Sequence, residues 1–553
     1  MTDKNSETTS LVPIKSNGLM KASKSIQITN KIIFNGIESL FNHAFYLINS
    51  KHLEISDVNY CFNIRYDNNY TKKMRFKFFA NSDEDYKNAI VIFSKVLILK
   101  PNFKFAYNYR GVSKMKLKDY NGAIEDYNKA IEIDPNYHIA CFNRGFSKSN
   151  LKDYEGAIAD YDKFIMIDSD NARAYTNRGH VKSDLNDYEG AIADYDKAIE
   201  IDPVYVSAYY IRGNAKSDLN DYQGAIEDYN KAIEINPEYD DAYNNRGNAK
   251  SDLIDYQGAI EDYGKAIEIN SVDAEVYYNR GLAKSNLNDN QEAFKDYSKA
   301  IEINPEFADA YRQRGIVKSG LNKHQDAIKD FSKAIEIKPE YADAYINRAT
   351  SKGVLNDYEG QMEDYNKAIE VDPKCADAYC QRGISKKDDL YDYQGALADF
   401  NKAIEINPKF ADAYRLRGYV KSTLNDYQDA IEDFSIAIEI DPNEISLYGN
   451  RCALKIKLND FTGAIEDCNK VIELYPKDGL TYFTRGQAKL KINDYVGAIE
   501  DFSKVIEIRP KYTDAYINRS NAKIKIGDLE GAILDKHIYE NLLNKKDANS
   551  SLL

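Results

Sequence analysis

The sequence predicts an all-α solenoid of helix-turn-helix repeats, preceded by a small N-terminal α/β-hairpin cap. The main observation is a motif, Asp-Tyr-Gln-Gly-Ala-Ile-Glu-Asp-Tyr-Asn-Lys-Ala-Ile-Glu-Ile-Asn-Pro at residues 221–237, which recurs with small changes every 34 residues. The second is that each copy carries two stretches of apolar residues at helical spacing. A unit this short cannot bury its apolar face alone, so neighbouring copies must stack into one continuous core.

One unit, residues 206–239, illustrates the two helices of each repeat. With Val206 as position 1, apolar or small residues fall at positions 3, 4, 8, 10 and 14, and again at 17, 20, 21, 24, 27, 28 and 30. This i, i+3, i+4 spacing predicts helix A and then helix B, with a break at 220–221 between them. Pro237 at position 32 ends helix B. Gly213 and Ala225, at positions 8 and 20, are expected to let the two helices approach closely.

The residues at the repeated positions resemble those of the tetratricopeptide repeat family. The matching positions of this unit are occupied by Tyr209, Gly213, Tyr222, Ala225, Tyr229, Ala232 and Pro237. Thirteen full units follow one another over residues 104–546. The resemblance implies a right-handed superhelix and a concave groove lined by positions 2, 5, 6, 9, 12 and 13 of helix A. It also implies a protein–protein interaction scaffold.

Three charged positions depart from the family pattern in every full unit. Position 7 is always Arg, position 11 always Lys and position 23 always Asp. Positions 7 and 11 lie one turn apart on helix A, so both cations share a face. We expect a ladder of Arg–Asp or Lys–Asp contacts that fixes how helices A and B meet. As exposed pairs these would contribute only ~0.2–1 kcal/mol each. A string of anion-binding sites is the alternative.

Composition narrows the classes of function. The 553 residues carry a net charge of −14, which argues against nucleic-acid binding because that needs a basic face. Six scattered Cys favour a reducing compartment and six His show no metal-ligand spacing, so no metal, cofactor or catalytic residue is expected. No apolar run reaches the ~18 residues of a membrane span. The polar N-terminus lacks the apolar core of a secretory signal. A cytoplasmic protein that is not an enzyme and binds no membrane is predicted.

The ends of the chain differ from the repeats. Residues 1–30 read as a disordered leader. Residues 31–80 read as an amphipathic helix followed by a β-hairpin, and residues 81–103 as a half repeat that supplies one helix B. Residues 547–553 are expected to fray. The segment 31–80 is interpreted either as a cap on the solenoid or as a module for self-association, which makes a structural assembly protein the alternative function.

The groove positions change character along the chain. The first two full repeats offer the aromatic residues Phe105, Tyr109, Phe142 and Phe146. The middle repeats offer acids, among them Asp184, Asp218, Asp252, Asp241, Glu275 and Asp309. The last three offer the cations Lys457, Lys491 and Lys525 beside Ile456, Leu490 and Ile524.

Position 6 carries a row of amides. Its members are Asn143, Asn177, Asn245, Asn279, Gln313, Asn347, Gln381, Asn450 and Asn518. Because amides both donate and accept hydrogen bonds, such a row could pair with the backbone of an extended peptide. The other interpretation is an Asn-Arg-Gly pattern copied by duplication. A carboxylate clamp for chaperone tails is disfavoured, because its cations are missing.

One repeat breaks the pattern of small residues. In residues 342–375, Ala349 replaces Gly at position 8 and Gln361 replaces Ala at position 20, and the next repeat has one extra residue before Tyr393. Larger side chains at a close helix contact predict overpacking. We therefore expect a looser joint between about 342 and 395.

Overall fold

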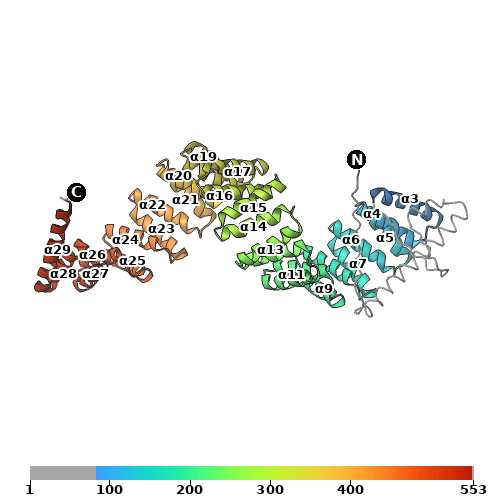
Figure 1. The fold of residues 1–553 in the computed structure, drawn as a ribbon, viewed down its shortest axis with the longest axis horizontal. Coiled ribbons are helices and arrows are strands. Elements are labelled where there is room, and N and C mark those ends of the chain that lie inside the picture. Colours follow the sequence, from blue (N-terminus) through green and yellow to red (C-terminus); the bar gives the residue numbers. More distant parts are fainter. Residues whose placement is uncertain (1–81, 551–553) are drawn as a thin grey trace. The chain divides into compact units, whose positions relative to one another are not determined.

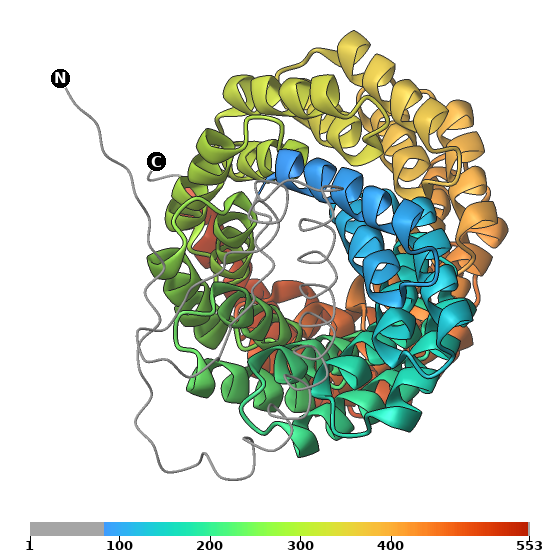
Figure 2. The same ribbon diagram turned by 90° about the vertical axis from the view of Figure 1, so that its right-hand side faces the viewer.

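The computed structural model describes residues 82–550, with side chains described to residue 543. The leader and the hairpin cap expected over residues 1–80 lie outside the described residues. Every regular element from residue 82 to residue 550 is an α-helix, α3 to α29, which confirms the all-α solenoid (Figure 1). Consecutive helices pack against each other along each part of the chain (Figures 1 and 2).

The described part of the chain divides into two compact units, with the boundary between residues 288 and 289. The helices of the first unit are α3 Asp83–Leu99, α4 Lys104–Lys116, α5 Tyr120–Ile133, α6 His138–Asn150, α7 Tyr154–Ile167, α8 Ala172–Asp184, α9 Tyr188–Ile201, α10 Val206–Asp218, α11 Tyr222–Ile235, α12 Asp240–Asp252, α13 Tyr256–Ile269 and α14 Ala274–Asn286.

The second unit continues the same alternation of helix A and helix B. Its helices are α15 Asn290–Ile303, α16 Ala308–Gly320, α17 His324–Ile337, α18 Ala342–Val354, α19 Tyr358–Val371, α20 Ala376–Asp388, α21 Tyr393–Ile406, α22 Ala411–Thr423, α23 Tyr427–Ile440, α24 Ile445–Lys457, α25 Phe461–Leu474, α26 Gly479–Lys491, α27 Tyr495–Ile508, α28 Thr513–Ile526 and α29 Leu529–Ser550. The last helix extends past residue 546, where the final repeat was expected to end.

The turn from helix A to helix B uses one left-handed residue and one cap. In the repeat that begins at Val206, Asn220 has φ 62°, a conformation that Asn tolerates better than most residues. The next residue, Asp221, is the N-cap of α11, and its Oδ1 accepts a hydrogen bond from the Gly224 amide at 3.0 Å. This bond satisfies one of the free N–H groups at the helix start. The recurring Asn-Asp pair therefore encodes the turn.

Helices A and B meet through a glycine and an aromatic ring. A Cβ placed on Gly213 would lie 2.7 Å from the ring of Tyr229, which is 1% exposed. The atoms nearest to position 8 in this repeat are thus those of the aromatic ring at position 24. Ala225 is itself fully buried.

The irregular repeat at 342–375 accommodates its larger side chains. A Cβ on Gly353 would collide with the amide of Gln361, so the glycine provides the space that the longer side chain occupies. The Gln361 Nε2 donates to Ser385 Oγ at 2.8 Å, which joins α19 to α20. The extra residue is absorbed in the turn after α20, where Asp389 is helical and Tyr391 has φ 56°. The predicted overpacking is therefore relieved by Gly353, and the looser joint remains a prediction.

We expect Ile254→Asn to stabilise the first unit. Ile254 occupies the left-handed turn position with φ 65° and is exposed, and a β-branched residue there costs about 1–3 kcal/mol. Thermal and urea unfolding should show a free energy of unfolding higher by about 1 kcal/mol. The matched control is Asn220→Ile, which should lower it. Equal stability of both variants and the parent would show that the turn carries no strain.

Candidate functional site

A buried carboxylate joins the two helices of each repeat. In the repeat that begins at Asp240, Arg246 on α12 donates to Asp262 on α13 through Nη2 at 2.5 Å and Nε at 2.8 Å. The Lys250 ammonium lies 2.8 Å from the second carboxylate oxygen. The Asp262 side chain is 5% exposed and that of Arg246 16%. This arrangement of one carboxylate and two cations is called the Arg–Asp–Lys clamp below.

The arginine of the clamp also contacts the preceding repeat. The Arg246 Nη1 donates to Asn230 Oδ1 at 2.5 Å, on α11. Its guanidinium carbon lies 5.3 Å from the centre of the Tyr243 ring, within the range of a cation–π contact. One side chain therefore ties together helix A, its own helix B and the helix B before it.

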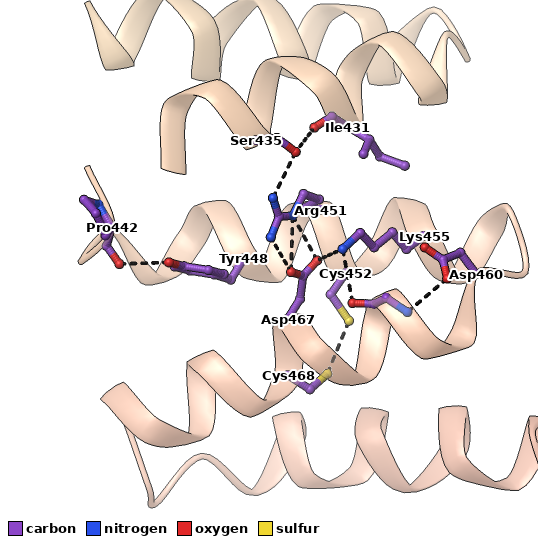
Figure 3. Close-up of polar contacts among 11 residues, drawn as sticks. Ile431, Ser435, Pro442, Tyr448, Arg451, Cys452, Lys455, Asp460, Asp467 and Cys468 are labelled. Carbon is purple, nitrogen blue, oxygen red and sulfur yellow. Dashed lines mark hydrogen bonds and ion pairs between the residues drawn. The ribbon is translucent and has the colours of Figure 1, made fainter. Parts of the chain in front are cut away.

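Figure 3 shows the clamp of α24 and α25. Arg451 donates to Asp467 through Nη2 at 2.5 Å and to Ser435 on α23 through Nη1 at 2.9 Å. The Lys455 ammonium lies 3.0 Å from Asp467 and donates to the Gly463 carbonyl at 3.2 Å. The lysine thus also satisfies a backbone acceptor near the start of helix B.

The structure confirms that these charges form a ladder of contacts within the fold. The same Arg–Asp pair is present at residues 110 and 126, 144 and 160, 178 and 194, 212 and 228, 246 and 262, 314 and 330, 348 and 364, 382 and 399, 417 and 433, 451 and 467, 485 and 501, and 519 and 535. The expectation of exposed pairs was wrong, because the carboxylates of these pairs are buried. Each carboxylate already pairs with an arginine and a lysine, so these cations are engaged within the fold, which disfavours anion-binding sites there.

Hydrogen bonds within the clamp shift the pKa of Asp535 and of Arg144. Burial alone would raise the pKa of Asp535, but the hydrogen bonds from Arg519 and Lys523 outweigh it and hold that pKa below its usual value. The hydrogen bond to Asp160 raises the pKa of Arg144. The charged forms of Asp535 and of Arg144 are therefore favoured.

The position 6 amides are half-buried, and several of them bridge successive A helices. In the first unit, Asn245 Nδ2 donates to Tyr210 Oη and to Asn214 Oδ1, each at 3.0 Å. Asn279 Nδ2 donates to Asn244 Oδ1 at 3.4 Å and to Asn248 Oδ1 at 3.3 Å. The two N–H donors of each amide are thus engaged by the preceding repeat, a role that the sequence reading did not anticipate.

The other amides of the row make more varied contacts. Asn143 donates to Asn108 at 3.0 Å, Asn177 bonds to Tyr161, Gln381 donates to Asp377 at 3.4 Å, Asn450 donates to Tyr419 at 2.6 Å, and Asn518 donates to the Asp514 carbonyl at 2.7 Å. Gln313 and Asn347 are also half-buried. The amides recur at the same repeat position in the sequence, but they do not make the same hydrogen bond in every repeat.

The aromatic residues of the first repeats pack mostly into the interior. Tyr109 stacks on Phe93 with ring centres 5.9 Å apart, and Phe105 contacts Tyr137 edge-on at 5.5 Å. Phe142 packs against Tyr161 at 5.6 Å, whereas Phe146 is 40% exposed. Of the four aromatic residues assigned to the groove, Phe146 presents the largest accessible ring surface and the other three contribute to packing between helices.

The acidic row lies on the surface of the first unit. Asp184, Asp218 and Asp252 occupy the last residue of α8, α10 and α12, and all three are exposed. Partial burial raises the pKa of Asp218 and of Asp252. A nearby cation would favour their charged forms, so this row is suited to a basic ligand.

Among the cavities in the described part of the second unit, we consider two that are lined mainly by A-helix residues. The first, about 510 Å³, is lined by Ile456, Phe461, Gln487, Ala488, Leu490, Lys491, Tyr495, Asn518, Asn521 and Lys525. The second, about 560 Å³, is lined by Tyr419, Ile445, Ser446, Gly449, Asn450, Cys452, Ala453, Ile456, Cys468, Val471, Asp478, Leu480, Thr481 and Thr484. Most of the A-helix residues that line them are at repeat positions 2, 5, 6, 9, 12 and 13. The structure thus brings Asn450, Asn518 and two of the C-terminal lysines to concave surfaces.

Two further classes of site were sought in residues 82–550. No group of three or more His, Cys, Asp or Glu side chains within that range has a geometry suited to a metal ion. No helix of the same range combines the length and the apolar character that a membrane span requires.

Family comparisons agree with the repeated geometry. Tetratricopeptide repeat models match residues 105–137, 138–171, 172–205, 274–307, 308–341, 342–375, 400–432 and 481–512, and a TPR repeat model matches 213–253 and 255–288. The chain belongs to the tetratricopeptide repeat family. No curated protein matches the full sequence significantly.

Several solved structures are similar to parts of the chain. The crystal structure of MamA is 28% identical over 31% of this chain and 94% of its own, with a TM-score of 0.29. YrrB, described as a TPR protein with an unusual peptide-binding site, is 28% identical over 33% of this chain and 95% of its own, with a TM-score of 0.30. Yeast Tom70 is 17% identical over 81% of this chain and 99% of its own, with a TM-score of 0.35.

Removal of one clamp carboxylate should destabilise its repeat strongly. In Asp228→Ala, the half-buried Arg212 and Lys216 lose their shared partner. Loss of one partner of a buried pair costs about 3–5 kcal/mol. Hydrogen exchange should show faster exchange in α10 and α11.

The matched control is Glu234→Ala on the exposed face of α11. Glu234 pairs with Lys231 at 2.6 Å, and both side chains are more than half exposed, so exchange should not change measurably. Equal effects of the two substitutions would show that the clamp contributes no more than a surface pair.

Proposed function

We propose that this protein is a non-catalytic interaction scaffold that binds an extended segment of a partner protein along the faces of its A helices. One observation carries the proposal. The A helices of the second unit form cavities in which amides, cations and apolar side chains lie together. Ligand sites typically combine an apolar lining with a few polar groups that orient the ligand. The TPR fold supplies the rigid support for such a surface.

The cavity between α24, α26 and α28 suits a particular peptide chemistry. Lys491 and Lys525 offer two cations that are exposed at the ends of their helices. Asn518 and Asn521 supply amides that donate to peptide carbonyls and accept from peptide N–H groups. The walls formed by Leu490 and by its neighbours Ile456, Phe461 and Tyr495 favour an apolar side chain. We infer a segment with an acidic residue beside an apolar one.

The first unit offers a different surface to a partner. The amide donors of Asn245 and Asn279 are engaged within the fold, so a peptide would use their carbonyl oxygens as acceptors. The exposed acids Asp184, Asp218 and Asp252 favour basic residues in the bound segment.

The five described cysteines are free thiols, which suits the cytoplasmic location that we propose.

Charge removal at the cavity should weaken partner binding. We expect Lys491→Ala/Lys525→Ala to raise the dissociation constant of the partner peptide about tenfold, equal to ~1.4 kcal/mol, while the helical content stays unchanged. Partners captured from cells of the source organism would be mapped to peptides by crosslinking mass spectrometry. Titration calorimetry would then measure each peptide.

The control variant for this pair is Lys470→Ala/Lys504→Ala, on helices α25 and α27. These lysines pair with Glu473 and Glu507 on an exposed face and line neither cavity. Binding should be unchanged. A loss of binding in this control with full binding in the cavity variant would overturn the proposed site.

Substitutions in the amide row separate its role in stability from its role in partner binding. Asn245→Ala/Asn279→Ala removes four hydrogen bonds between repeats, each worth about 0.5–1.5 kcal/mol. We expect lower unfolding stability of the first unit and weaker binding of any partner that occupies it. Circular dichroism melts and calorimetry on the same samples would measure both. Lower stability with unchanged affinity would leave the row a purely structural feature.

A further inference from the structure

Two framework positions change together in the repeat of residues 445–478. In the flanking repeats the position 8 residue is glycine and the position 24 residue is aromatic. A Cβ on Gly418 would lie 3.0 Å from the Phe434 ring, and one on Gly486 would lie 2.8 Å from the Phe502 ring. In the repeat between them both positions are cysteine.

The two thiols occupy the space of the missing ring. Cys452 on α24 and Cys468 on α25 point toward one another, with their sulfur atoms 3.3 Å apart (Figure 3). A disulfide has a sulfur–sulfur distance of about 2.05 Å, so the atoms need to approach by about 1.3 Å. Rotation of the two side chains with a small helix shift accounts for a movement of this size.

The Arg–Asp–Lys clamp keeps the two thiols in register. Arg451 directly precedes Cys452, and Asp467 directly precedes Cys468. Their ion pair, at 2.5 Å, joins the backbones of α24 and α25 one residue away from the thiols. The pair is therefore held by interactions that do not depend on the sulfur atoms.

The thiols are accessible to small molecules alone. Cys452 is 4% exposed and Cys468 2% exposed, yet both line the cavity of about 560 Å³ on the A helices. Gly449 and Ala453 also line it, and a Cβ on Gly449 would meet nothing within 4 Å. A small neutral oxidant fits such an opening, whereas a folded protein does not.

The contact between the thiols favours one of them as the nucleophile. The hydrogen bond from the Cys468 thiol lowers the pKa of Cys452, although burial opposes it. The same contact, together with burial, raises the pKa of Cys468. Since the thiolate is the reactive form, this hydrogen bond favours Cys452 as the attacking thiol.

We propose that Cys452 and Cys468 are a dithiol site that hydrogen peroxide oxidises to a disulfide between α24 and α25. The Cys452 thiolate attacks one peroxide oxygen, the O–O bond breaks, and the departing hydroxide takes up a proton to give water and a Cys452 sulfenic acid. The Cys468 sulfur then attacks the Cys452 sulfur, and the S–O bond breaks. The leaving oxygen takes the Cys468 proton and departs as a second water. Two thiols lose two electrons and the peroxide gains them.

The disulfide would lock one repeat and reshape the cavity that it adjoins. It closes a short loop that contains the A-to-B turn, and this restricts local opening of α24 and α25. The two sulfurs also line the cavity that contains Asn450. This proposal rests on the thiol geometry and stands independently of the proposed peptide binding.

The test uses the full reduced chain and hydrogen peroxide. After exposure, free thiols are blocked by alkylation under denaturing conditions, and the intact protein and its proteolytic peptides are weighed. We expect a loss of two hydrogens, one linked pair of peptides that contain residues 452 and 468, and reversal by dithiothreitol. Hydrogen exchange in α24 and α25 should slow on oxidation.

Two variants keep the test decisive. Cys452→Gly/Cys468→Tyr restores the glycine–aromatic pair of other repeats, so it should fold but show no peroxide-dependent change in exchange. Cys380→Ser removes a buried cysteine of another repeat and should oxidise like the parent. Thiols 452 and 468 that stay fully alkylatable after peroxide, or that link to other cysteines instead, would overturn the proposal.

Discussion

The buried ion clamp between helices A and B is the constraint on which the rest of the structure depends. Arg246, for example, joins its own helix hairpin to the preceding one, through contacts to a buried carboxylate, a residue of the earlier helix B and an aromatic ring. Apolar packing of alanine and aromatic side chains supplies the main driving force. The clamp fixes how helices A and B meet, because a planar guanidinium and a carboxylate pair in a fixed orientation. In a solenoid, where stability is a sum of local terms, such a repeated tie sets the stacking of every neighbour.

The helix boundaries and the A-to-B turns followed well from the sequence. Apolar spacing, the Asn-Asp turn and the proline after helix B act locally, so the repeat of residues 206–239 forms helices where the pattern predicts them. The burial of the clamp could not be predicted from the sequence. The sequence indicated that arginine, lysine and aspartate meet, but the burial of Asp262 depends on how three helices pack around it. The charges of these three residues alone suggested an ion pair on the surface.

The contacts of the groove residues were likewise not predictable from the sequence. Phe105, Tyr109 and Phe142 stand at groove positions by their numbering, yet their rings turn toward neighbouring helices. For Asn245 the sequence left open both a peptide-binding role and a pattern copied by duplication, and the structure shows that its donors are engaged by Tyr210 and Asn214. Gln361 and Gly353 compensate each other across a helix pair, which a position-by-position comparison of the repeats does not reveal. A side chain's partners in the next repeat decide what it leaves for a ligand.

If the scaffold binds through its A helices, partners should contact only the face that these helices form. The most direct measurement places a photo-crosslinking amino acid at Gln487, which lines a cavity on α26, or at Glu500, which is exposed on α27. Mass spectrometry then identifies the captured peptides. The account predicts that a partner segment is captured from position 487 and not from position 500. Capture of the same segment from position 500 alone would contradict it.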